Sequence, residues 1–115
     1  MKSLGLIEVQ SVTAAIDALD IMCKTASVEF VTWERRLGGC LVTVIVQGSV
    51  SAVQQAVEAA AEKCIKELAA YAVIANPHEE TARILELSAS RTRRVYEERC
   101  RAEQEKADEK YLQEV

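Results

Sequence analysis

Two strand-like segments joined by a Gly38–Gly39 turn constrain the fold of this chain more than any other feature. The second segment, residues 41–46 (LVTVIV), is continuous and rich in β-branched residues, which is typical of a central strand covered on at least one face. The first segment alternates over residues 28–32. Glycine tolerates a positive φ angle, so the turn predicts a β-hairpin between these two strands.

The remaining segments complete a ferredoxin-like pattern. Ser11 and Ser49 each precede a run of apolar residues at helical spacing, so both are predicted N-caps. The expected elements are a strand over 4–9, a helix over 11–26, the hairpin strands 28–32 and 41–46, a helix over 49–68, a strand over 71–75 and a terminal helix from Pro77. The order βαββαβ predicts an α+β fold with an antiparallel sheet and both long helices on one face.

The composition changes near residue 88. Residues 1–88 are long enough for one domain with a core of small side chains, since half of the chain is hydrophobic and only 4% is aromatic. Residues 91–115 instead hold seven basic and seven acidic residues and few apolar ones. We therefore expect a domain over 1–88 and a charged, helical, solvated tail over 89–115.

Charge and hydropathy argue against two classes of partner. The formal net charge is −4, and a nucleic-acid-binding domain usually carries a basic footprint. No uninterrupted apolar run is long enough to span a bilayer, and the N-terminal residues lack a signal-peptide pattern, so we expect a cytoplasmic protein.

The four cysteines are spread singly, which favours free thiols over a disulfide framework in a reducing compartment. Cys23 and Cys64 are expected in the core, and Cys100 is expected on the surface of the tail.

The series of segments resembles a known family. The segments that carry the resemblance are 4–8 (LGLIE), 15–26 (AIDALDIMCKTA), 37–39 (LGG), 42–50 (VTVIVQGSV), 52–61 and 73–78 (VIANPH). In this order, over residues 4 to about 87, the chain resembles the bacterial microcompartment shell proteins of the single-domain hexamer type, which contain one BMC domain.

The resemblance implies a structural protein and not an enzyme. Members form cyclic hexamers that tile the facets of a polyhedral shell in the bacterial cytoplasm, with a central pore for small metabolites. The implied partners are further copies of the chain (a homohexamer), other shell proteins and encapsulated enzymes.

The resemblance also implies two sets of site residues. The pore set comprises Arg36, Leu37, Gly38, Gly39 and Cys40, and the edge where hexamers meet comprises Lys24, Asn76, Pro77 and His78. Three positions depart from the family pattern. Asn76 replaces an arginine that helps to lock neighbouring hexamers, the approach to the pore over 33–37 is about one residue longer, and Cys40 stands where many members have glycine.

Cys40 has two interpretations. A six-fold ring would place six thiols around one axis, and thiolates are the ligands of an iron–sulfur cluster. A 4Fe–4S cluster at Cys40 is one hypothesis, although six thiols exceed what such a cluster uses, so the symmetry would have to be broken locally. Alternatively, Cys40 is a small apolar residue at the start of a strand.

The other candidate side chains also leave alternatives open. Arg35 and Arg36 either line the pore mouth, where they would favour anionic metabolites, or pair with Glu29 or Glu34. Lys24 is either an edge residue or an ordinary lysine at a helix C-terminus. His78, the only histidine, is expected to bond to the backbone.

Two other classes of protein share the predicted topology. One is a regulatory domain that binds a small molecule between paired sheets, and it is the main alternative. The other is an acylphosphatase-like enzyme, which is disfavoured because no pair of Arg and Asn flanks a phosphate-binding loop. A regulatory dimer would be much smaller than a hexamer in solution.

Overall fold

A computed structural model of the chain describes residues 2–35 and 38–114. Arg36 and Leu37 of the predicted pore set lie outside the described residues. The elements are β1 (Ser3–Gln10), α1 (Val12–Thr25), β2 (Glu29–Glu34), a short 3-10 segment (Gly38–Cys40), β3 (Leu41–Gly48), α2 (Val50–Lys63), β4 (Ala70–Ile74) and α3 (Glu79–Glu114).

The strands form one antiparallel sheet in the order β2-β3-β1-β4. β1 pairs with β3 over its whole length, from Ser3 opposite Gly48 to Gln10 opposite Leu41. β2 and β3 form the predicted hairpin, with an irregularity between Phe30 and Thr32. The ferredoxin-like α+β prediction is therefore confirmed.

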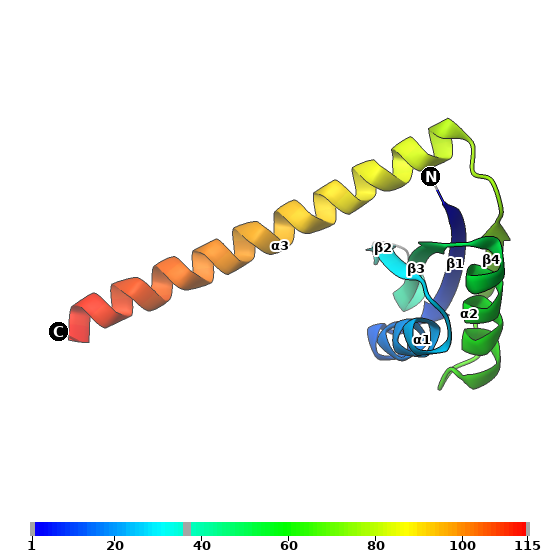
Figure 1. Cartoon of the computed structure of the whole chain (residues 1–115). Coiled ribbons are helices and arrows are strands. Elements are labelled where there is room, and N and C mark those ends of the chain that lie inside the picture. The colour runs from blue at the N-terminus through cyan, green and yellow to red at the C-terminus, as the bar shows by residue number, and fades with distance from the viewer. Residues whose placement is uncertain (1, 36–37, 115) are drawn as a thin grey trace.

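The core lies between the sheet and the helices α1 and α2 (Figure 1). Both predicted N-caps are confirmed, because the Ser11 and Ser49 hydroxyls accept hydrogen bonds from the backbone N–H groups of Ala14 and Ala52. The helices bury mainly alanine and valine, which lets them lie close to the strands. The buried helix residues are Ala14, Ala15, Ala18 and Met22 of α1, and Val53, Ala56, Val57, Ala59 and Ala60 of α2.

Helix α3 packs on the opposite face of the sheet and then leaves the domain. Its main contacts are with β2, on the face of the sheet that carries Thr32. The side chain of the neighbouring Trp33 instead packs against the core under α1 and α2. Residues 79–114 contain neither proline nor glycine, so the helix continues through the boundary that the sequence placed at residues 88 and 89. In Figure 1 its distal half extends far beyond the domain.

Two details differ from the sequence-based expectations. Helix α2 ends at Lys63 rather than near Leu68, and Leu68 instead packs on the core from the connection to β4. Cys23 was expected in the core, and this was wrong, since its side chain is exposed. Cys23 follows the buried Met22 by one residue, and one residue turns a helix by about 100°, which takes the side chain out of the core.

The approach of α2 to β1 depends on Gly5. A Cβ atom at this position would lie 2.8 Å from Val53 Cγ1 and 2.9 Å from Val57 Cγ2. We expect Gly5→Ala to lower the free energy of unfolding by about 1–3 kcal/mol, because overpacking forces these side chains or the backbone to shift. Chemical denaturation at fixed protein concentration measures this change. Gly38→Ala is the matched control, since nothing lies within 4 Å of a Cβ there, and equal losses in both variants would contradict the prediction.

Candidate functional site

The loop that contains Gly38, Gly39 and Cys40 is tied to the start of α1. The Ser11 N–H donates to the Cys40 carbonyl over 3.0 Å, and Gln10 Nε2 donates to the Gly39 carbonyl over 3.3 Å. Gly39 has φ 72°, and both Cys40 (61°) and Ser11 (89°) adopt positive φ angles that are unusual for residues with a side chain. The bond between Ser11 and Cys40 thus joins two strained positions and holds the loop at one end of the sheet.

A groove of about 840 Å³ opens beside this loop, between β2, the start of β3 and α3. Its wall includes three arginines, two aromatic rings and the exposed thiol of Cys40. These lining residues are Arg35, Arg91 and Arg99, Trp33 and Tyr96, and Cys40. The predicted pore residue Cys40 therefore shares a surface with side chains of α3 that lie more than 50 positions away in the sequence.

Arg35 stacks on an aromatic ring instead of pairing with an acid. Its guanidinium carbon lies 4.7 Å from the centre of the Trp33 ring, a cation–π contact. The acids that the sequence suggested as partners are engaged elsewhere. Glu29 accepts from Gln47, and Glu34 accepts from Ser88. Within residues 2–35 and 38–114, Arg35 thus keeps its positive charge available to the groove.

Hydroxyl groups fix α3 to β2. Thr32 is fully buried, and its Oγ1 lies 3.0 Å from Ser88 Oγ and 3.4 Å from Thr92 Oγ1. Ser88 donates its single proton to the Glu34 carboxylate, so Thr32 donates to Ser88. These hydrogen bonds satisfy the buried Thr32 hydroxyl and fix the point along β2 at which α3 crosses the sheet.

Sequence reasoning missed the contribution of α3 to this surface. The helix residues Ser88, Arg91, Tyr96 and Arg99 were assigned to the charged tail or its margin, yet all of them line the groove. One signal was available, because Ser88 and Thr92 place two hydroxyls four residues apart on one face of a charged helix. On the same helix, a hydrogen bond with Cys100 and the repulsion from its sulfur when deprotonated raise the pKa of Tyr96.

The thiols of one subunit do not gather. Cys40 is exposed at the loop, Cys23 lies on α1, and Cys100 lies on the distal part of α3. Among the described residues, no group of three histidine, cysteine or acidic side chains is placed to hold a metal ion. A single chain therefore offers one thiol at the loop, and an iron–sulfur cluster would need thiols from several subunits.

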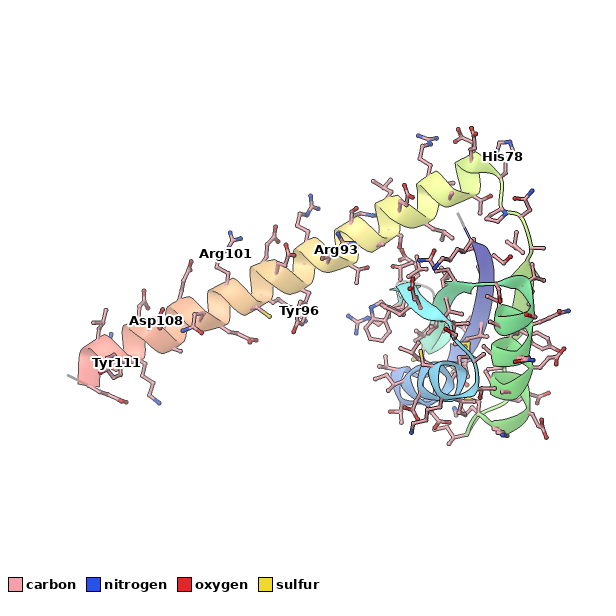
Figure 2. All side chains as sticks on the ribbon, viewed as in Figure 1. His78, Arg93, Tyr96, Arg101, Asp108 and Tyr111 are labelled. Carbon is pink, nitrogen blue, oxygen red and sulfur yellow. The ribbon has the colours of Figure 1, made fainter. Side chains whose placement is uncertain are left out.

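The predicted edge residues lie on two elements away from the groove. Lys24 forms an ion pair with Asp20 over 2.7 Å, and this hydrogen bond, with the attraction between the charges, raises the pKa of Lys24. His78 Nδ1 accepts from the Glu80 N–H over 3.1 Å, which confirms the expected bond to the backbone and orients the ring at the start of α3 (Figure 2). Pro77 is half-buried and Asn76 is exposed.

In the described part of the chain, no helix combines the length and the apolar character that a membrane crossing requires.

Comparison with known proteins gives a consistent result. The profile of the BMC domain family matches residues 3–77. The chain is 44% identical over 86 residues to the bacterial microcompartment shell protein PduA of Citrobacter freundii, covering 73% of this chain and 91% of that protein. It is 42% identical over 91 residues to the carboxysome shell protein CsoS1C of Hydrogenovibrio crunogenus, covering 76% and 88% respectively.

A solved structure agrees with these sequence matches. The crystal structure of a microcompartment protein from Desulfitobacterium hafniense superposes with a TM-score of 0.66 at 31% sequence identity. The match covers 72% of this chain and 48% of that one, so this chain spans about half the length of the solved protein.

The hydroxyl contacts under α3 generate a test. We expect Ser88→Ala to lower the free energy of unfolding by about 1–3 kcal/mol, because the buried Thr32 hydroxyl loses its nearest hydrogen-bond partner. Hydrogen exchange measured by mass spectrometry should show faster exchange in the first three turns of α3. Ser90→Ala is the control, since Ser90 is exposed on the same helix. Unchanged protection in Ser88→Ala would show that these bonds do not hold the helix.

Proposed function

This chain belongs to the BMC domain family of bacterial microcompartment shell proteins, and we propose that it forms a cyclic homohexamer that tiles such a shell around a central pore. The observation that carries the proposal is the family match over residues 3–77, which includes the whole sheet and the loop of Gly38–Cys40. A head-to-tail contact repeated six times closes into a ring, and each subunit then presents the same loop to the axis.

The geometry of the loop supports its role as a pore rim. Gly38 has open space around it, Gly39 adopts a positive φ angle, and Cys40 is exposed, so the loop projects little side-chain bulk beyond the thiol. Its two hydrogen bonds to Gln10 and Ser11 give it a defined position relative to the sheet. A rim built from such a loop has a diameter set largely by backbone.

The charge beside the loop supports passage of anions. Arg35 has no acidic partner among the described residues and lines the same groove as Cys40. Six copies of Arg35, together with Arg36, would create a positive potential at the pore mouth. A ring of like charge raises the local concentration of oppositely charged solutes, so we propose small anionic metabolites as the solutes that cross.

The work of the protein in this proposal is assembly, with other shell proteins as edge partners and enzymes enclosed by the shell. Lys24 is exposed at the end of α1, and Asn76 and His78 are exposed in the segment that leads into α3. We propose that these two places form the edge between hexamers. A lysine near a two-fold axis can reach across to backbone carbonyls of the neighbouring hexamer, but Asn76 cannot form the bidentate bonds that an arginine would.

An iron–sulfur cluster held by several Cys40 thiols remains a second proposal for the pore. The observation in its favour is an exposed thiol on a strained loop at the place where six subunits would converge. Cysteine thiolates are suitable ligands, and the bound cluster would supply one-electron transfer across the shell. Each subunit would contribute one thiol, while Ser11 and Gln10 would hold the loop that carries it.

Light scattering after size exclusion tests the assembly. We expect a mass of about six subunits for the wild type, Lys24→Ala and Lys63→Ala, but flat sheets in electron micrographs only for the wild type and Lys63→Ala. Lys63→Ala is the matched control, because Lys63 lies in the last turn of α2 as Lys24 does in α1. A dimer would instead favour the regulatory domain, and sheets of Lys24→Ala would exclude an edge role for Lys24.

Anaerobic purification tests the cluster. We expect brown protein with roughly four iron atoms and four sulfides per hexamer, and loss of the colour in Cys40→Ser. Cys23→Ser serves as the control, since it removes another exposed thiol away from the loop. A colourless hexamer after reconstitution with iron and sulfide would exclude the cluster and leave a metabolite pore with a cysteine at its rim.

A further inference from the structure

The distal half of α3 has no support from its own domain. Every residue from Arg93 to Glu114 is exposed, and the helix points away from the sheet (Figures 1 and 2). Tyr111 and Leu112 near its end are 68% and 73% exposed. Helices in proteins gain most of their stability from tertiary packing of one face. We therefore expect the distal half to pack against the surface of another protein chain.

The charges of α3 are segregated along its length. Residues 91–101 contain five arginines and two glutamates, whereas residues 103–114 contain five acidic residues and two lysines. The first segment carries two of the three arginines that line the groove, Arg91 and Arg99, and the second segment is the unsupported end. One helix thus presents a positive and a negative segment, and the negative one lies about 15–30 Å further from the domain.

The groove offers a complementary surface for that negative segment. In the described part of the chain, Arg35, Arg91 and Arg99 form no ion pair, while Arg94 of α3 pairs with Glu98. The same wall carries the Trp33 ring and the Tyr96 ring, whose residue is 69% exposed. A partner that fits this surface combines acidic side chains with an aromatic or apolar side chain.

We propose that residues 103–114 of one subunit lie in the groove of a neighbouring subunit of the same ring, an inference that rests on the proposed hexamer. Asp108 and Glu109 would then meet Arg91 and Arg99, and Tyr111 would pack on Trp33. The segment cannot reach the groove of its own subunit, because α3 is one uninterrupted helix and residues 88–99 of that helix form the groove wall.

A ring of subunits would favour binding of the acidic segment to the neighbouring groove and would give every such contact the same direction around the ring. A second copy of the chain supplies the acidic segment at the same concentration as the groove, and neighbours in a ring hold the two at a short, fixed separation. Because the helix end and the groove are different surfaces, the contact is head-to-tail and repeats around the ring. α3 would thus act as a strap that joins each subunit to the next.

Disulfide trapping tests the strap on the full chain. Cys23→Ser and Cys100→Ser remove the other exposed thiols, and Cys40 remains as the reporter in the groove. Cysteine is then introduced singly at residues 109–112, which together sample every side of the helix. Mild oxidation should give a ladder of covalent species up to the hexamer on non-reducing gels. Glu79→Cys, exposed at the other end of α3, and Cys40→Ser should both abolish the ladder.

The pattern of the gel separates the outcomes. A ladder that ends at the dimer would overturn the strap, because two reciprocal bonds within one pair indicate a symmetric contact. Monomer alone at all four positions would also overturn it. Light scattering of the same samples reports the hexamer independently, so a hexamer without a ladder rejects only the strap. A smaller particle rejects the proposed function and the strap together.

Charge reversal tests the chemistry of the contact. With the thiol at residue 112, Asp108→Lys with Glu109→Lys should slow trapping roughly tenfold, since each exposed ion pair contributes a modest energy. Adding Arg91→Glu with Arg99→Glu should restore most of the rate. Glu58→Lys with Glu62→Lys on α2 is the matched control for net charge and should leave the rate unchanged. Equal rates in all variants would overturn the proposed charge pairing.

Discussion

The pairing of β1 with β3 is the interaction on which the rest of the structure depends. These two strands form the middle of the sheet and join the first residues of the chain to residues 41–48 through a complete antiparallel register. One face of the pair carries the valines that pack against α1 and α2, and the other face lies on the side where α3 crosses. A slip by one residue would exchange these faces and expose the core.

The same pairing determines where the loop lies. The register ends with Gln10 opposite Leu41, and the next residues along each strand, Ser11 and Cys40, continue the ladder with one more backbone hydrogen bond. The chain turns sharply at this point, and both residues adopt strained positive φ angles there. A pore rim made from this loop would therefore inherit its position from the centre of the sheet rather than from the flexibility of a turn.

Helix α3 adds a second layer to a fold that the family match describes only as far as residue 77. Its attachment to β2 includes a chain of hydrogen bonds that links Thr32, Ser88 and Glu34. Hydrogen bonds of hydroxyl groups are directional, so they help to fix the orientation and the position of α3 on the sheet. Because the helix is long and unbroken, this local contact also determines where its distal charges are presented, well away from the domain.

The sequence by itself determined the features that depend on neighbours along the chain. Period-two alternation and the Gly38–Gly39 turn predicted the hairpin, Ser11 and Ser49 predicted the helix starts, and the order of elements predicted the sheet. Only the tertiary structure decided which face of α3 meets β2, that Arg35 stacks on Trp33, and that α3 arginines share a groove with Cys40. Some of these contacts join residues that are distant in sequence. The contact of Arg35 is one of several that its charge would allow. The periodicity of neighbouring residues does not determine either kind of contact.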